Sequence, residues 1–163
     1  ELHGHTVRAG RRPVLASFLP ATPQLSAMVQ IDVLYQGGLR TEATHGPSNQ
    51  TLITDAPLDN QGKGESFSPT DLVATGLATC LLTVMGIVAE RQARDLEGGR
   101  AGVVKIMAGE GPRRIERLEV HIRVPVRPEE KVRLALEKAA QGCPVHATLG
   151  GNVQMDVSFE WGV

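Results

Sequence analysis

Between residues 29 and 54, apolar and polar residues alternate in a way that is typical of β-strands. From Val29 to Tyr35 most apolar residues occupy every second position, which places them on one face of a strand. Gly37-Gly38 predicts a hairpin turn, and a second strand is expected over Leu39–His45. After a further turn, Gln50–Thr54 is expected to form a short third strand. The pattern therefore predicts an antiparallel meander.

The longest apolar stretch of the chain predicts a helix from about residue 69 to residue 94. Ser68 can cap this helix, Pro69 suits its first position, and Asp71 completes a capping box. Residues 72–89 carry no formal charge, which raises the question of a membrane span. Because threonines and glycines interrupt the apolar run, we expect its hydrophobicity to be modest. We therefore predict a buried central helix rather than a membrane span.

The second half of the chain alternates between strand and helix patterns. Strands are expected over Val103–Ala108 and, more strongly, over Ile115–Val126. A second helix is expected to begin at Pro128 and to end at Gly142, and a last strand is expected over Val153–Trp161. The order β-β-β-α-β-β-α-β predicts an α+β fold with antiparallel sheets around the long central helix.

Residues 1–27 differ from the rest of the chain. They contain arginines and prolines without a sustained period, and their one apolar run is shorter than the core of a signal peptide. Met28 then opens the first strand pattern. We interpret residues 1–27 as a leader, a tag remnant or a mis-called upstream extension, and residues 28–163 as a single domain.

The composition narrows the classes of partner. The net charge is −1 and aromatic residues make up 3% of the chain, so neither charge nor stacking surfaces favour a nucleic acid or an anionic membrane. Two cysteines are too few for the disulfide scaffold of a small secreted protein. We therefore expect a cytoplasmic protein whose thiols are kept reduced.

The two cysteines occupy unlike surroundings. Cys80 lies inside the apolar helix, and Cys143 follows the second helix and precedes a proline. One interpretation is a reactive thiol with a second thiol that resolves it, and the alternative is two inert residues that fill space. His146 forms a Cys-x-x-His fragment with Cys143, which is too little for a zinc site. Neither a metal nor a cofactor is expected.

Two motifs together resemble the osmotically inducible protein C and organic hydroperoxide resistance (OsmC/Ohr) family. They are Ser68-Pro69-Thr70-Asp71-Leu72 running on to Ala78-Thr79-Cys80, and Gly142-Cys143-Pro144-Val145. The resemblance covers about residues 29–161, and the loop over 54–65 is similar to a less characterised OsmC-like branch. It implies an intertwined homodimer that reduces organic hydroperoxides, with Cys80 as the peroxidatic cysteine and Cys143 as the resolving cysteine. The implied reductant is an external dithiol of the lipoyl type.

The resemblance also implies an arginine and an acid beside the reactive thiol. Arg40 is the candidate arginine, although Leu39 separates it from the paired glycines that precede it in the family. The family has a glutamate ten residues before the peroxidatic cysteine, where this chain has Thr70. Glu65 or Asp71 is expected to take its place, and we name Glu65 as the candidate.

A second hypothesis belongs to another class of function. An OsmC-like protein without enzymatic activity would hold a small apolar ligand at the dimer cleft. Consumption of an organic hydroperoxide, lost in Cys80→Ser, separates the two hypotheses.

Overall fold

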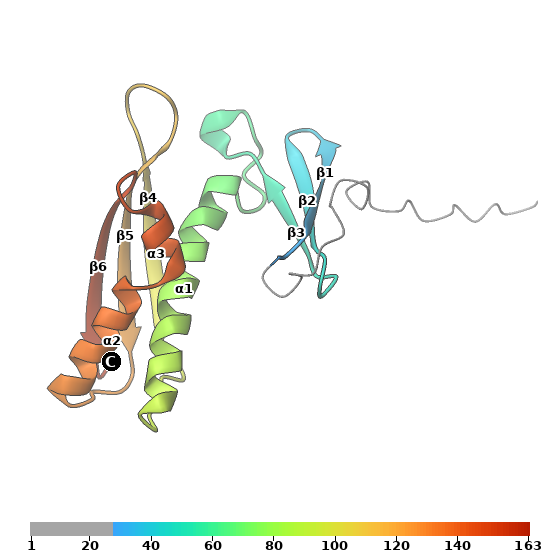
Figure 1. Cartoon of the computed structure of the whole chain (residues 1–163). Coiled ribbons are helices and arrows are strands. Elements are labelled where there is room, and N and C mark those ends of the chain that lie inside the picture. The colour runs from blue at the N-terminus through green and yellow to red at the C-terminus, as the bar shows by residue number, and fades with distance from the viewer. Residues whose placement is uncertain (1–27) are drawn as a thin grey trace, which may run out of the picture. The chain divides into compact units, whose positions relative to one another are not determined.

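The computed structural model describes residues 28–163, and the expectations for residues 1–27 lie outside this part of the chain. The chain divides into two compact units, which join in the sequence between Ser66 and Phe67. The first unit contains a small sheet, and the second contains a sheet with helices (Figure 1). That residues 28–163 form a single domain stays a prediction.

The first unit is the predicted meander. Its three strands pair antiparallel in the order β1-β2-β3, and a short 3-10 helix, η3, follows them in the loop to the next unit. The bounds are β1 Ile31–Gly37, β2 Arg40–His45, β3 Thr51–Asp55 and η3 Leu58–Asn60. Apolar side chains on this sheet are exposed in the chain alone, among them Val33, Leu34 and Ile53. The unit therefore contains apolar surface that its own residues do not bury.

The turn between β1 and β2 is one residue later than the glycine pair predicted. Gly37 pairs with Arg40, so Gly38 and Leu39 are the central residues of the turn, and both have positive φ, at 60° and 64°. Two positive φ values are typical of a tight hairpin turn, which matches the twist of the flanking strands. Leu39 thus belongs to the turn, and Arg40 becomes the first residue of β2.

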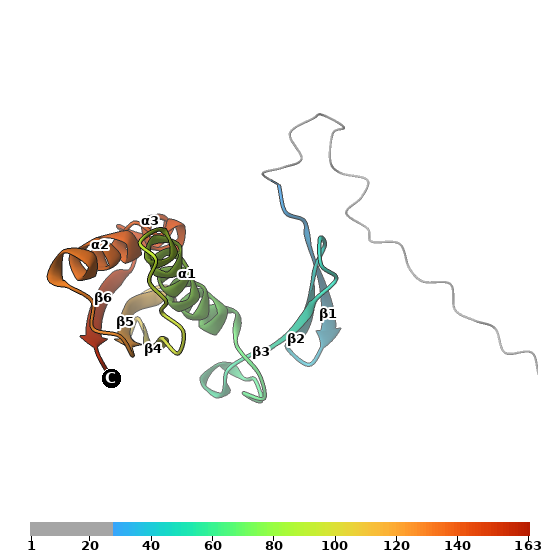
Figure 2. The ribbon, with the colours of Figure 1, turned by 90° about the horizontal axis from the view of Figure 1, so that it is seen from below.

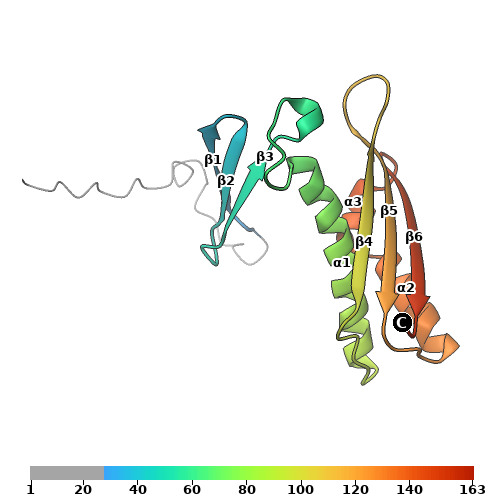
Figure 3. The same ribbon diagram turned by 180° about the vertical axis from the view of Figure 1, so that it is seen from behind.

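The second unit places three helices on one face of a three-stranded sheet (Figure 2). The bounds are α1 Pro69–Arg91, β4 Arg100–Met107, β5 Ile115–Val124, α2 Glu130–Gln141, α3 Pro144–Leu149 and β6 Gln154–Trp161. The core lies between α1, α2 and the sheet, and its fully buried large side chains include Leu77, Leu81, Met85, Leu118, Ile122 and Leu136. Seen from behind, the other face of the sheet carries no helix among the described residues (Figure 3).

The α+β fold is confirmed, with one difference in strand pairing. β4 and β5 pair antiparallel as expected, but β5 and β6 pair parallel. A parallel pair needs a crossover connection that returns the chain to the end where the first strand began. Here α2 and α3 form this crossover, so the sheet of the second unit is mixed.

Helix α1 begins as the sequence predicted. The side chain of Ser68 accepts a hydrogen bond from the backbone N–H of Asp71, and the Asp71 carboxylate accepts one from the backbone N–H of Ser68. This reciprocal pair satisfies two N–H groups that would otherwise lack partners at the helix terminus. The helix ends at Arg91, three residues before the predicted boundary.

The burial and hydropathy of α1 differ from the prediction. Its buried residues, Ala74, Leu77, Ala78, Leu81, Met85 and Ala89, form one stripe, whereas apolar residues elsewhere on the helix, such as Ile87, are exposed in the chain alone. The sheet, α2 and α3 cover one side only, because this unit supplies no element for the other side. The hydropathy of the most apolar 18 residues of α1 is also higher than expected, and by length and composition alone this helix could cross a membrane.

Candidate functional site

The structure brings the two cysteines together within the second unit. Cys80 lies in the middle of α1, and Cys143 is the N-cap residue of α3, which contacts α1. The Cys80 side chain interacts directly with that of Cys143, and both are free thiols. Cys80 is held in place by the helix that contains it. Cys143 is held between the end of α2 at Gly142 and the first residue of α3, Pro144, whose ring fixes the backbone.

The two thiols differ in their access to solvent. Cys143 is 0% exposed and belongs to the hydrophobic core, whereas Cys80 is half-buried at the border of that core. The Cys143 sulfur also accepts a hydrogen bond from the backbone N–H of His146, with the two atoms 3.2 Å apart. A molecule that arrives from solvent therefore reaches Cys80 before it reaches Cys143.

Burial raises the pKa of the Cys143 thiol. The N–H of His146 opposes this effect, but the neighbouring Cys80 thiol raises the pKa of Cys143 further through a hydrogen bond and through charge. Cys143 therefore stays a protonated thiol at neutral pH and can donate a hydrogen bond to Cys80.

The first unit brings together the candidate arginine and the candidate acid. A guanidinium nitrogen of Arg40 lies 3.1 Å from a carboxylate oxygen of Glu65, and the two side chains are 33% and 53% exposed. Arg40 opens β2, and Glu65 lies at the end of the loop that follows β3. Arg40 and Glu65 belong to the first unit, and the two thiols belong to the second.

Asp71, the other acid considered, has different partners. One of its oxygens caps α1, and the other lies 2.6 Å from the Nζ atom of Lys105, which also donates to the hydroxyl of Thr70 at 2.8 Å. Burial works to raise the pKa of Asp71, but the hydrogen bonds from Lys105 and Ser68 outweigh it and lower that pKa. Both carboxylate oxygens of Asp71 are therefore bound to partners in the second unit.

Sequence analysis missed Lys105 and the contribution of Asp55. Lys105 looked like an ordinary polar position on a strand, and only the packing of β4 against α1 brings it to Thr70 and Asp71. Asp55 looked like a loop residue, but its carboxylate is fully buried and accepts the backbone N–H of Glu65 at 2.9 Å. Its position at the end of a strand, before a loop rich in glycine, was the available signal.

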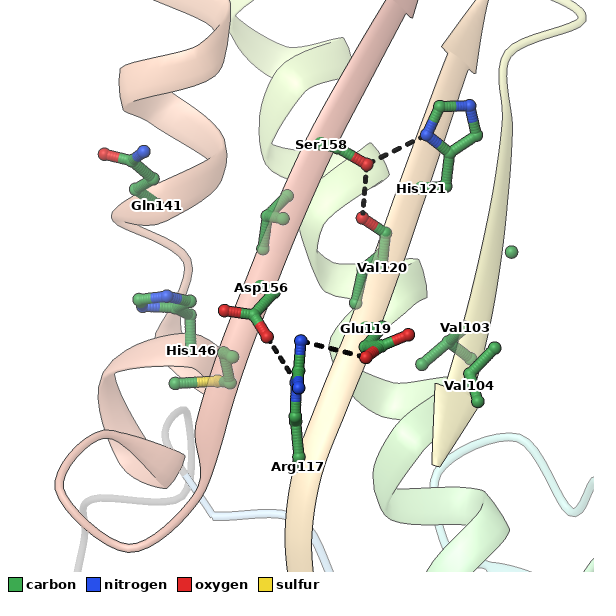
Figure 4. A pocket seen from close by; sticks show the side chains of 13 residues that line it. Val103, Val104, Arg117, Glu119, Val120, His121, Gln141, His146, Asp156 and Ser158 are labelled. Carbon is green, nitrogen blue, oxygen red and sulfur yellow. Dashed lines mark hydrogen bonds and ion pairs between the residues drawn. The ribbon is translucent and has the colours of Figure 1, made fainter. Parts of the chain in front are cut away.

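A cavity of about 1040 Å³ lies elsewhere, along β4, β5 and β6 (Figure 4). Arg117 contacts both Asp156 and Glu119 there, and His121 lies 2.9 Å from the hydroxyl of Ser158. Opposite charges are paired with one another, and neither cysteine lines the cavity. Over residues 28–163, no group of three or more histidine, cysteine or acidic side chains is arranged to hold a metal ion.

Comparison with solved structures gives many similar folds. The crystal structure of a Psychrobacter arcticus 273-4 protein, named for osmotic stress induction and a detoxification response, is 42% identical, with a TM-score of 0.77. The match covers 84% of this chain and 99% of that chain. No curated protein matches the chain.

More distant structures share the fold. An organic hydroperoxide resistance protein OsmC from Legionella pneumophila is 19% identical, with a TM-score of 0.67, and the match covers 82% of this chain and 96% of that one. The organic hydroperoxide resistance protein OhrB of Bacillus subtilis is 18% identical, with a TM-score of 0.63, and the match covers 82% and 98%.

A family model agrees with these folds. The model of OsmC-like proteins matches residues 62–158, which include α1, both cysteines and most of β6. Together with the 42% identity over most of both chains, this match shows that the chain belongs to the OsmC-like protein family.

Proposed function

We propose that the protein is a thiol-dependent peroxidase that reduces organic hydroperoxides and so protects the cell against oxidative stress. The observation that carries the proposal is the meeting of Cys80 and Cys143, which are the only two cysteines in the chain. Their contact through α1 and α3 is what a cycle of thiol oxidation and disulfide formation requires.

The difference in exposure assigns the two roles. Cys80 is the peroxidatic residue because it is the more exposed of the two cysteines. Cys143 is the resolving residue because it is buried in the core and burial raises its pKa, so that it stays protonated at neutral pH. A thiol that titrates above neutral pH is a poor first nucleophile.

The reaction proceeds in three balanced steps. The Cys80 thiolate attacks the terminal oxygen of ROOH, the O–O bond breaks, and the alkoxide leaves and takes up a proton as ROH. Cys80 is now a sulfenic acid. The Cys143 thiol then attacks the Cys80 sulfur, which releases water and forms a disulfide. An external dithiol of the lipoyl type reduces this disulfide by two successive exchanges and is itself oxidised to a cyclic disulfide.

Arg40 and Glu65 complete the proposed site. A cation beside Cys80 favours the thiolate, and Arg40 is a cation already oriented by an ion pair with Glu65. Glu65 thereby takes the part that the family resemblance gives to an acid at the position of Thr70.

We further propose that this assembly is an intertwined homodimer. In the chain alone, the side of α1 that contains Ile87 is uncovered, and so are apolar side chains of the first unit such as Val33. Exposed apolar area of this kind favours burial at an interface, at roughly 25 cal/mol for each Å² removed from water. A second copy of α1 packed against the first would cover the exposed side of this helix.

The proposed substrates are organic hydroperoxides, and the proposed location is the cytoplasm. Around Cys80, α1 offers small or apolar neighbours that are partly exposed, such as Gly76 and Val84. Such a surface favours an alkyl or aryl hydroperoxide over hydrogen peroxide, because burial of the organic group adds to binding. The names of the Legionella and Bacillus proteins support the same class of substrate.

The test is the consumption of cumene hydroperoxide in the presence of dihydrolipoamide. The wild-type protein is expected to consume the hydroperoxide, and Cys80→Ser is expected to abolish consumption because no other thiol can attack first. Thr83→Ser, one turn further along α1, is the matched control and should retain the wild-type rate. A wild-type protein that ignores hydroperoxides while an apolar ligand co-purifies would instead favour a binding module.

A further inference from the structure

Asp55 is a buried carboxylate next to the proposed Arg40–Glu65 ion pair. It is the last residue of β3 and is 0% exposed. In the pairing of β2 with β3 it lies directly opposite Arg40. Carboxylates are rarely buried so completely unless hydrogen bonds or charges compensate for the lost hydration. Groups around Asp55 must therefore stabilise its carboxylate.

The loop after β3 folds around this carboxylate. The Oδ2 atom of Asp55 accepts the backbone N–H of Glu65 at 2.9 Å, which ties the far end of the loop back to its start. The backbone of Gly64 donates to the carbonyl of Ala56 at 3.2 Å, which closes the same loop a second time. Gly62 has no room for a side chain, because a Cβ atom there would overlap the carbonyl oxygen of Ala56.

The same contacts keep the Asp55 carboxylate charged. The backbone N–H of Glu65 is the largest influence that lowers the pKa of Asp55, burial opposes it, and the positive charge of Arg40 lowers that pKa further. Asp55 therefore stays ionised at neutral pH. The Nε atom of Arg40 and the Oδ1 atom of Asp55 are both buried without a close hydrogen-bond partner in the described part of the chain. Arg40 is thus paired directly with Glu65 and attracted through space by Asp55.

We propose that Asp55 is a positioning residue, which fixes the backbone of Glu65 and so holds the Glu65 carboxylate against Arg40. The inference rests on the proposed function, in which Arg40 stabilises the Cys80 thiolate. Asp55 does not touch the reacting atoms and acts through Glu65 and Arg40.

The need for such a residue follows from where the acid lies. Glu65 is at the end of a loop, and without an anchor the loop would lose conformational entropy each time the ion pair formed. An acid at the position of Thr70, in the first turn of α1, would be fixed by the helix itself. In this chain the buried Asp55 carboxylate supplies the rigidity that the helix would have supplied.

The test is Asp55→Asn in the full chain, measured as kcat/KM for cumene hydroperoxide well below the melting temperature. Asparagine has one acceptor oxygen and no charge, and its NH2 group would face backbone N–H groups and Arg40. We expect kcat/KM to fall about tenfold, as for other residues that orient a catalytic group. Asp32→Asn, in β1 of the same unit, is the matched control and should retain wild-type kcat/KM.

A double-mutant cycle separates positioning from a general loss of structure. In an Arg40→Met background, Asp55→Asn should cost less than about twofold, because the group through which Asp55 acts is gone. A residue that only stabilises the fold would cost the same factor in both backgrounds, and that result would overturn the inference. So would Asp55→Asn with the wild-type kcat/KM.

A second readout does not depend on activity. In the wild-type protein the Glu65 amide should exchange slowly with deuterium, and Asp55→Asn should accelerate this exchange at least tenfold. Gly62→Ala should accelerate it as well, because the loop cannot close around the added methyl group. If the wild type consumes no hydroperoxide, the proposed function fails, and the anchoring of Glu65 is then judged by exchange alone. Unchanged exchange in Asp55→Asn would refute the anchoring.

Discussion

The carboxylate of Glu65 lies 3.1 Å from the guanidinium of Arg40, although a strand, a turn, a second strand and a loop separate these residues in the sequence. The pair identifies which of the two candidate acids contacts the arginine. Asp71 is bound to Lys105 and to the first turn of α1. The candidate acid of the site is therefore carried by a loop and not by the helix.

Cys143→Ser should separate the two halves of the proposed cycle. Cys80 would still attack a hydroperoxide once, but no thiol would remain to condense with the sulfenic acid. We expect one equivalent of alcohol per chain in the absence of added thiol, and a gain of one oxygen atom in the intact mass. A dimedone adduct on Cys80 would confirm the species. Wild-type turnover in Cys143→Ser with a reductant that cannot reduce a sulfenic acid directly would contradict the resolving role.

Glu65→Gln and Asp71→Asn form a matched pair, since each removes one carboxylate charge. Glu65→Gln should lower kcat/KM for cumene hydroperoxide about tenfold, because Arg40 loses the charged partner that orients it. Asp71→Asn should leave kcat/KM within about twofold of wild type. It should instead lower the free energy of unfolding by about 1 kcal/mol, because it weakens the cap of α1. The reverse result would show that Asp71 is the acid of the site.

Lys105→Met should make stability less dependent on pH in the acid range. The folded-state pKa of Asp71 lies below its ordinary value of 3.8, so the stabilisation is fully present above pH 3.8 and is lost as the pH falls through the folded-state value. At pH 6 we expect Lys105→Met to lower the free energy of unfolding by about 1 kcal/mol, a value that allows for the partial exposure of Asp71. Urea unfolding at several pH values should show the difference from wild type shrinking below pH 3.8. A difference that stays constant down to pH 2 would contradict this account.

Ile87→Glu tests the proposed dimer. Ile87 is 44% exposed on α1 in the chain alone, and a buried charge at an interface between two copies would be costly. We expect wild-type protein to sediment as a dimer at micromolar concentration and Ile87→Glu to shift it toward monomer. Val104→Glu, at an exposed position on β4 outside α1, is the control and should remain dimeric. Monomeric wild-type protein would refute the proposed assembly.

The order of elements was predictable because each element has a strong local signal. The capping residues at Ser68 and Asp71 start α1, and alternation alone identifies β5. The tight turn was displaced by one residue, since the sequence favoured two glycines and the structure places Leu39 at a positive φ. The parallel direction of β6 could not be predicted, because a helical crossover permits either edge of the sheet and either direction.

The candidate site was predictable only in part. The thiol pair could be proposed because Cys80 and Cys143 are the only cysteines and lie in motifs that resemble a known family. The anchor at Asp55 and the partner Lys105 could not, because both act through contacts between elements distant in sequence. Burial of a carboxylate or an ammonium group is decided by the packing around it, and neither residue type signals its own burial.

The crossover between β5 and β6 also affects how the chain folds during its synthesis. Cys143 lies in the crossover that joins these two strands. Contacts between distant segments are made late, after the local ones, because closing a long loop costs entropy first. A nascent chain therefore carries two separated thiols until the crossover has been synthesised and α3 has packed against α1.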